Sequence, residues 1–179
     1  VLEINPNNIF TLLSKGHALK NLGKYEEALD AFNKAIEINP QDKLIENIIE
    51  ICFNLALDEL KKENRGNAVK FMTAVHGIST KLKEDKVPTL IMNFLKSAAD
   101  SGDLQVVKAS VDEIIKSFGN KYEERIKFII KALEIIETKD IQKYYNLQIE
   151  EREIVGDIVK RITKSDELLP EEIRRKKAV

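Results

Sequence analysis

Cysteine and tryptophan are almost missing from this chain of 179 residues, which has Cys52 as its single cysteine and no tryptophan. One cysteine cannot form an intrachain disulfide, and such usage is typical of proteins from a reducing cytosol, so we predict a cytoplasmic location. Cys52 lies at helical spacing among Ile48, Ile49 and Leu55. We therefore expect a buried structural thiol, and a reactive or metal-binding cysteine is the alternative.

Long apolar runs are missing as well. None approaches the roughly 20 residues that a membrane-spanning helix needs, and no signal peptide begins the chain. The sequence therefore predicts no membrane partner. Val1 instead stands within what reads as the last turn of a helix, so we expect the chain to be part of a longer protein.

Neither sign of charge dominates, because 29 basic residues face 30 acidic ones. Residues 1–42 carry 4 basic and 6 acidic groups, and residues 121–164 carry 10 and 9. This balance weakens binding to nucleic acid or to an anionic membrane as the main role. Lysine outnumbers arginine by 23 to 6, a bias that a thermophilic source or an A+T-rich genome would each produce.

Catalytic signatures are absent too: the chain contains no G-x-x-x-x-G-K-[ST], G-x-G-x-x-G or G-x-S-x-G. Its two histidines, His17 and His76, lie in no H-E-x-x-H or Cys/His cluster. The acidic pairs Glu26-Glu27 and Glu123-Glu124 fall in the first turns of expected helices, where carboxylates suit the positive end of the dipole. We predict a protein that is not an enzyme and has no catalytic, cofactor or metal site.

A short sequence segment occurs twice in the chain. Residues 1–8, ending in Asn5-Pro6-Asn7-Asn8, return 34 residues later as residues 35–42, ending in Asn39-Pro40-Gln41-Asp42. A repeat at this period predicts stacked helix-turn-helix units. Glycine, with 7 residues, and proline, with 4, are scarce, which also favours a helix-rich fold.

Residues 9–42 resemble the tetratricopeptide repeat, and residues 1–8 resemble the end of a preceding copy. The positions that carry the resemblance are Leu12, Gly16, Leu19, Gly23, Tyr25, Ala28, Phe32, Ala35 and Pro40. Gly16 and Ala28 are small where two helices would cross closely, and Gly23 permits a tight turn. Tyr25 is expected to fill the space between this hairpin and its neighbour. The resemblance implies an all-α fold, a right-handed α-solenoid of antiparallel helix pairs.

Beyond residue 42 the signature fades but apolar stripes at helical spacing continue. They predict helices that are separated at Gly66-Asn67, Val87-Pro88, Ser101-Gly102-Asp103, Gly119-Asn120 and Thr138-Lys139-Asp140. The last long helix is expected to run over residues 140–163. We expect tetratricopeptide repeats in 1–42, degenerate helical hairpins in 43–164 and a charged tail helix in 165–179; a distinct helical domain after residue 42 is the alternative.

The resemblance also implies a function and a site. In this family the first helix of each hairpin lines a concave groove, and the corresponding positions here are Phe10, Leu13, His17, Lys20 and Asn21. A subset of the family grips a carboxylate with a Lys and an Asn one turn apart. This chain has Leu13 and His17 there, so an apolar or helical peptide is the expected ligand. The alternative is that Phe10 and Leu13 pack against an upstream repeat or a neighbouring subunit. The predicted role is a protein–protein interaction scaffold.

Other roles stay open. A helical-repeat RNA-binding module is one alternative, and the regulatory arm of an enzyme whose catalytic domain lies outside this chain is another. The 140–163 helix carries Ile141, Tyr144, Tyr145, Ile154, Ile158 and Ile162. This apolar surface predicts self-association as a homo-oligomer. The basic cluster Arg174–Lys177 is expected at an exposed helix end, with contact to an acidic partner as the alternative.

Overall fold

The computed structural model describes residues 8–171 and residue 174, and these residues are helical without any strand. The first four helices form two hairpins: α1 (Ile9–Asn21) with α2 (Tyr25–Ile38), and α3 (Asp42–Lys61) with α4 (Arg65–Ser79). The remaining elements are α5 (Val87–Asp100), α6 (Leu104–Phe118), the 3-10 helix η1 (Gly119–Tyr122), α7 (Glu123–Thr138), α8 (Ile141–Tyr145) and α9 (Ile149–Thr163). The prediction of an all-α helical solenoid is confirmed.

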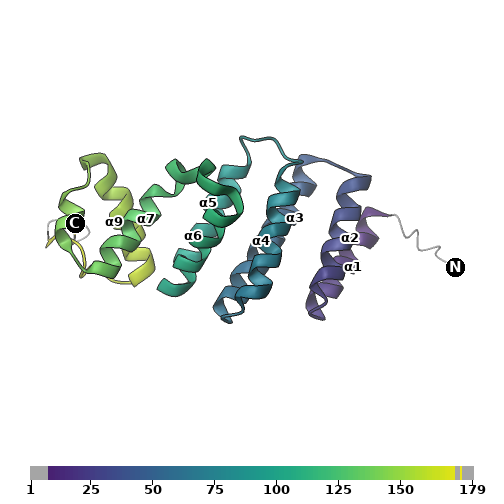
Figure 1. Ribbon diagram of the computed structural model, residues 1–179, viewed down its shortest axis with the longest axis horizontal. Coiled ribbons are helices and arrows are strands. Elements are labelled where there is room, and N and C mark those ends of the chain that lie inside the picture. Colours follow the sequence, from purple (N-terminus) through teal and green to yellow (C-terminus); the bar gives the residue numbers. More distant parts are fainter. Residues whose placement is uncertain (1–7, 172–173, 175–179) are drawn as a thin grey trace.

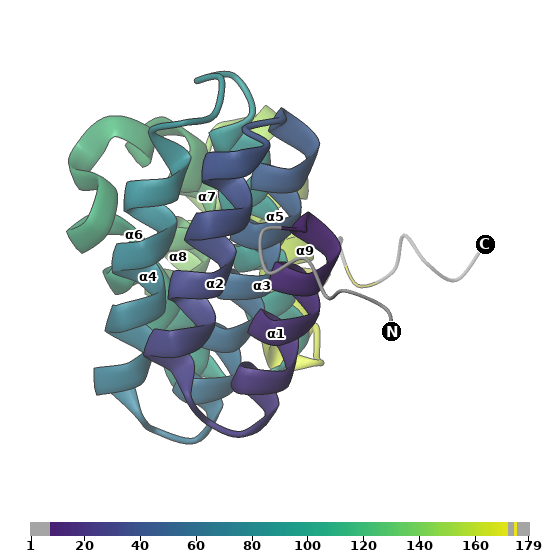
Figure 2. The same ribbon diagram turned by 90° about the vertical axis from the view of Figure 1, so that its right-hand side faces the viewer.

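The hairpins stand side by side along the long axis of the molecule (Figure 1). Seen from the end, α1, α3 and α5 lie on one side and α2, α4 and α6 on the other (Figure 2). Apolar residues from α1 through α9 join one continuous core between these layers. Each hairpin therefore buries its apolar faces against its neighbours, as stacked repeats do.

A single residue with left-handed backbone makes the turn in each hairpin. These residues are Gly23, Glu63, Gly102 and Lys139, with φ of 73°, 58°, 72° and 51°. The left-handed conformation reverses the chain just after a helix ends. Glycine adopts it without strain, so Glu63 and Lys139 occupy a place that glycine fits better.

The turn of the second hairpin differs from the prediction. The sequence placed the break at Gly66-Asn67, but α3 ends at Lys61 and α4 begins at Arg65. Asn64 decides the boundary, because its side chain accepts a hydrogen bond from the backbone N–H of Asn67 at 3.4 Å. Asparagine is among the best N-terminal caps. Gly66 therefore falls inside the first turn of α4.

The predicted breaks around α5 and α6 are confirmed. α5 begins at Val87 with Pro88 in its first turn, a position that tolerates proline because the helix leaves that N–H unpaired anyway. The Asp103 side chain caps α6 by accepting from the N–H groups of Gln105 and Val106, at 2.9 and 3.2 Å.

The expectation of one helix over residues 140–163 is wrong, because the segment divides into α8 and α9. Arg152 of α9 holds the corner: its guanidinium donates to the carbonyls of Tyr145 and Leu147, at 2.6 and 3.2 Å. An unbroken helix of 24 residues would be about 36 Å long, whereas the 16 residues of α7 span only about 24 Å. The break lets α9 pack beside α7.

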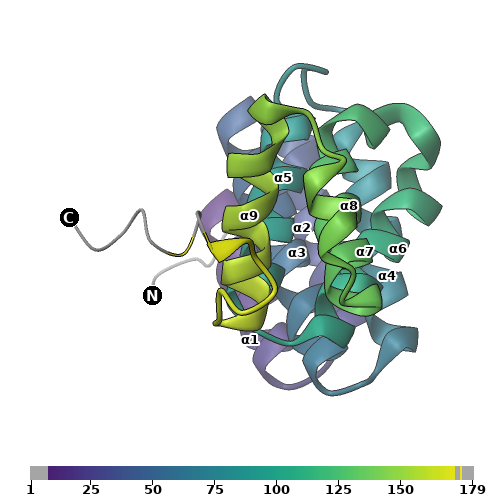
Figure 3. The ribbon, with the colours of Figure 1, turned by 90° about the vertical axis from the view of Figure 1, so that its left-hand side faces the viewer.

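α9, rather than α8, completes the last unit. It packs against α7 and lies on the same side as α5 (Figure 3). Arg161 of α9 pairs with Asp100 at the end of α5 at 2.6 Å, and the Lys164 ammonium donates to the Asp100 carbonyl at 2.9 Å. Within the expected tail helix over 165–179, residues 165–170 form turns and bends instead of a helix, and Glu171 and Arg174 are helical. Residues 172–173 and 175–179 of that segment lie outside the described residues.

Candidate functional site

All five residues predicted to line a groove belong to α1, and we call them the α1 surface: Phe10, Leu13, His17, Lys20 and Asn21. Phe10 is 80% exposed, a large fraction for an aromatic side chain. His17 and Asn21 are exposed, while Leu13 and Lys20 are half-buried. The α1 surface therefore combines an apolar start with a polar end one to three turns along the helix.

Phe32 of α2 packs against the centre of α1, at Gly16 and His17. Its ring packs so closely on Gly16 that a Cβ atom at this glycine would lie 2.4 Å from the Phe32 Cε1 atom. The predicted reason for a small residue at Gly16, a close crossing of α1 and α2, is confirmed. The His17 ring stands edge-on to Phe32, with centroids 5.7 Å apart and planes at 75°. The position of His17 is therefore tied to the core of the hairpin.

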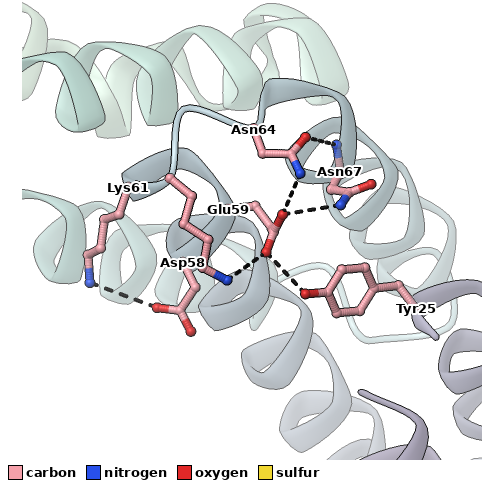
Figure 4. Close-up of polar contacts among 7 residues, drawn as sticks. Tyr25, Asp58, Glu59, Lys61, Asn64 and Asn67 are labelled. Carbon is pink, nitrogen blue, oxygen red and sulfur yellow. Dashed lines mark hydrogen bonds and ion pairs between the residues drawn. The ribbon is translucent and has the colours of Figure 1, made fainter. Parts of the chain in front are cut away.

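A buried carboxylate, Glu59, joins the first hairpin to the second (Figure 4). The residue is only 3% exposed. Oε1 accepts from the Tyr25 hydroxyl at 3.1 Å and from the Lys62 ammonium at 2.9 Å, and Oε2 accepts from the side-chain amides of Asn64 and Asn67 at 2.8 and 3.1 Å. We call these five residues the Glu59 network. A buried charge is tolerated when each oxygen is paired in this way.

The network changes the protonation of its members. Burial alone would raise the pKa of Glu59, but hydrogen bonds from Lys62, Asn67 and Tyr25 outweigh burial and hold the pKa below its ordinary value. For Tyr25, burial and then the hydrogen bond to Glu59 raise the pKa of the phenol. Glu59 is therefore ionised and Tyr25 neutral at pH 7, which suits a stable hydrogen-bonded junction rather than an acid–base pair.

Tyr25 has the place that the sequence predicted, because its ring packs edge-on against Phe71 of α4 with centroids 5.0 Å apart. The sequence analysis missed Glu59, since a glutamate near the end of a helix resembles any solvated charge. The only available signal was position: Glu59 stands on the apolar stripe between Ala56 and Leu60, both buried.

The remaining candidates for chemistry have structural roles. Cys52 is buried, as predicted, and burial raises the pKa of its thiol to about 12, which makes it a poor nucleophile. The His76 ring packs edge-on against Phe118 with centroids 5.2 Å apart, as expected of a packing histidine. In the described part of the chain, no group of three or more His, Cys, Asp or Glu side chains is placed to hold a metal ion.

The acidic pairs lie in the first turns of α2 and α7, as predicted. Glu26 pairs with Lys70 of α4 at 2.7 Å, and Glu124 pairs with Lys127 at 2.9 Å. Within the basic cluster at the C-terminal end, Arg174 donates to the Leu169 carbonyl at 2.8 Å. Residues 175–177 of that cluster lie outside the described residues.

A cleft is lined by residues of α3 and α5. These two helices lie on the same side of the array as α1 (Figure 2). The lining residues of the cleft come only from these two helices: Glu50, Phe53 and Asn54 from α3, and Leu90, Asn93, Phe94 and Ser97 from α5. The sequence analysis did not single out this set. None of the helices in the described residues is both long and apolar enough to cross a membrane.

Comparison with known proteins gives one family and one curated relative. Residues 9–42 match the model of the family described as "Tetratricopeptide repeat", the same residues that carry the resemblance in the sequence. The protein named "Outer envelope protein 61" from Arabidopsis thaliana is 28% identical over 130 residues. That match covers 67% of this chain but only 22% of the relative, so the chain spans about a fifth of the relative's length. No solved structure matches the chain.

Proposed function

We propose that this chain, which carries a tetratricopeptide repeat at residues 9–42, is a protein–protein interaction scaffold that binds a partner peptide or helix on the α1 surface. The observation that carries the proposal is the 80% exposure of Phe10 beside the half-buried Leu13 on one helix. Aromatic side chains at the centre of an interface contribute much of its free energy. Leaving Phe10 in water gives up that contribution unless a partner covers it.

The chemistry of the α1 surface favours a ligand with apolar side chains. Phe10 and Leu13 offer apolar area, whereas Lys20 and Asn21 offer polar contacts at the other end. His17 lies between these two groups and is held by Phe32. An amphipathic helix, which presents apolar residues at a spacing of three and four, matches such a surface.

We further propose that residues 43–164 continue the array as degenerate tetratricopeptide-like hairpins. Two correspondences between the first and second hairpins support this. When the second hairpin is aligned on the first with a shift of 40 residues, Glu63 falls on the turn residue Gly23. The same shift places Gly16 over Ala56 and Ala28 over Ala68, so small buried residues recur where helices cross. A longer array would extend the binding side from α1 to α3 and α5.

Self-association is a second candidate, supported by apolar side chains at the C-terminal end of the array. Ile149 is 78% exposed, and Ile141, Tyr145 and Ile154 are also exposed. Tyr144 and Ile162 were predicted to belong to this apolar surface, but both are buried in the core. The proposed contact surface between copies is therefore smaller than the apolar surface predicted for residues 140–163. It centres on α8 and the start of α9.

A cytoplasmic location belongs to the proposal, supported by a buried free thiol that needs no oxidising compartment. The relative from Arabidopsis is named for an outer envelope.

Selection of a phage-displayed random peptide library against the chain tests the proposal. We expect the enriched peptides to share apolar residues at helical spacing. The double variant Leu13→Asp with His17→Ala should lose the selected peptides, whereas Ile38→Asp on α2, another exposed apolar position, should keep them. Circular dichroism on both variants checks that the helices persist.

Two results would overturn the proposal. Retention of the selected peptides by the folded Leu13→Asp, His17→Ala variant would remove the α1 surface as the site. Enrichment of no peptide, together with salt-sensitive retention of RNA by the chain, would favour the RNA-binding alternative.

A further inference from the structure

The cleft between α3 and α5 has an apolar floor and a polar rim. Phe53 and Phe94 stack at its base with ring centroids 4.6 Å apart and planes 18° from parallel, and Leu90 lies beside them. Glu50, Asn54, Asn93 and Ser97 form the rim, and all four are exposed. Its volume is about 170 Å³, and since a water takes up about 30 Å³ of liquid, the cleft has room for one long side chain.

The rim side chains have no bonding partner elsewhere in the described part of the chain. Two acidic residues earlier on α3 have such a partner. Glu46, one turn before Glu50, accepts from the Lys86 ammonium at 2.5 Å, and Asp42 pairs with Lys86 at 3.3 Å. Lys86 therefore neutralises the acidic start of α3. Glu50 is left as the single charged group that lines the cleft.

We propose that this cleft binds an arginine side chain presented by a partner peptide. A guanidinium can pair with a carboxylate through two parallel hydrogen bonds, and its remaining N–H groups can donate to carboxamide oxygens. Glu50 supplies the carboxylate, and Asn54 and Asn93 supply the carboxamides from the two walls. The apolar stem of an arginine can lie along the small apolar area that Phe53, Phe94 and Leu90, which are 3%, 4% and 6% exposed, leave at the base of the cleft.

Other occupants fit the cleft less well. An acidic side chain would face the Glu50 carboxylate, and like charges repel strongly when water is excluded. An apolar side chain would offer no hydrogen bond to Glu50, Asn54 or Asn93, which are exposed at the rim, and would gain only the small apolar area at the base of the cleft. Charge and hydrogen-bonding capacity therefore both select a cationic donor.

The proposal rests on the proposed function, because it names a partner chemistry for the same side of the array. It adds a second contact point, one that the α1 surface does not contain. A partner that reaches from α1 to α5 would combine apolar anchors at the first hairpin with an arginine at the cleft. Two linked contacts of this kind raise affinity beyond either contact alone.

Nuclear magnetic resonance titration of the ¹⁵N-labelled chain tests the cleft directly. The probe is N-acetyl-arginine-N-methylamide, and the matched control is N-acetyl-citrulline-N-methylamide, which has nearly the same shape without the charge. We expect the arginine probe to shift the backbone and side-chain amide signals of Asn54 and Asn93 and the amides of Glu50 and Ser97. Citrulline should bind at least about fivefold more weakly, as expected when a charged hydrogen-bonded pair is lost.

Variants separate this site from the rest of the surface. Glu50→Gln should weaken the arginine probe by a similar factor, whereas Glu37→Gln, an exposed glutamate on α2, should leave it unchanged. Equal shifts from the arginine and citrulline probes, equal binding by the Glu50→Gln variant, or no cleft shifts up to tens of millimolar arginine probe would overturn the proposal.

The two proposals fail in different ways. In one case the Leu13→Asp, His17→Ala variant loses its selected peptides, but the arginine probe does not shift the amide signals of the cleft residues. The cleft proposal is then wrong and the proposed function stands. If the arginine probe binds the cleft while that variant keeps its peptides, the cleft is supported and the α1 surface is not the peptide site.

Discussion

Glu59 is the residue on which the junction between the first and second hairpins depends most. Its two oxygens accept four hydrogen bonds from side chains that come from α2, α4 and the turn between α3 and α4. The Tyr25 donor lies 34 residues earlier in the chain. A buried ion pair of this kind is not by itself a source of great stability, but removing one partner is costly. It orients two hairpins that have few other polar contacts.

The variant Glu59→Gln should lower the free energy of unfolding at pH 7 by about 2–3 kcal/mol, because hydrogen bonds to a charged, buried acceptor are lost. The pKa of Glu59 in the folded chain lies below its ordinary value of 4.5. The ionised carboxylate therefore stabilises the fold above about pH 4.5, and that contribution disappears as the pH falls through the folded pKa. Urea denaturation at several pH values should show wild type and variant converging in acid.

Glu37→Gln is the control for this measurement, since Glu37 is exposed on α2. It should change the stability at pH 7 by less than about 0.5 kcal/mol. A Glu59→Gln chain as stable as wild type at pH 7 would show that the network contributes nothing to the junction.

The turns are the elements that set the period of the array. Left-handed residues stand at Gly23, Glu63, Gly102 and Lys139, so the hairpins repeat at intervals of 40, 39 and 37 residues. The first copy has the 34-residue period of the family, while α3, with 20 residues, is longer than α1, with 13. The added residues lie at the start of α3, because a shift of 40 residues places α1 over residues 49–61. At this shift Leu19, Gly23 and Tyr25 are replaced by Glu59, Glu63 and Arg65, so the signature is lost through substitution.

Exchanging residues at these turns should change stability in opposite directions. Glu63→Gly should raise the free energy of unfolding by about 1 kcal/mol, because glycine takes the left-handed conformation without strain. Gly23→Ala should lower it by about 1–2 kcal/mol for the same reason, and no atom within 4 Å of the added Cβ complicates the result. Thermal and urea unfolding measure both changes.

Gly77 supplies the control, because it lies inside α4 and an added Cβ would also meet no atom within 4 Å. Gly77→Ala should stabilise the chain by about 0.5–1 kcal/mol, as alanine does within a helix. A destabilising Glu63→Gly would mean that the Glu63 side chain makes a contribution larger than its backbone strain.

The whole molecule is an array whose two ends differ. At one end, α1 buries only Leu12, Gly16 and Leu19. Phe10 of α1 and Leu22, the residue that follows this helix, are exposed. At the other, α9 folds back beside α5 and α7, and an ion pair joins Arg161 to Asp100. Even so, this end leaves Ile149 almost uncovered. Exposed apolar groups at the ends of an array favour contact with another chain.

Light scattering at increasing protein concentration tests whether that contact is with a second copy. We expect the mass to rise toward that of a dimer, and Ile149→Glu to return it to a monomer by placing a charge in the apolar contact. Leu22→Glu, at the opposite end and 72% exposed in the wild type, should have no effect. A chain that stays monomeric at every concentration would remove self-association.

Local sequence determined much of the fold. Gly23, Val87-Pro88 and Ser101-Gly102-Asp103 end or begin helices through properties of the residues themselves, and each stands where it was predicted. Gly16 and Ala28 likewise predicted a close helix crossing. Helix ends and small residues of this kind depend on residues within one or two helical turns. They can therefore be predicted from the local sequence. All five residues of the α1 surface could also be named in this way, although their role as a site stays a prediction.

Only the tertiary structure decided the rest, because the causes lie far apart in the chain. Glu59 acquires its role from Tyr25, which α2 brings across from the preceding hairpin. The cleft exists because Phe53 of α3 stacks on Phe94 of α5, 41 residues later. The 140–163 segment breaks between Tyr145 and Ile149, where Arg152 donates to the carbonyls of Tyr145 and Leu147, and its apolar stripe divides between core and surface. Burial and pairing are properties of neighbours in space, so these residues looked ordinary until the helices were stacked.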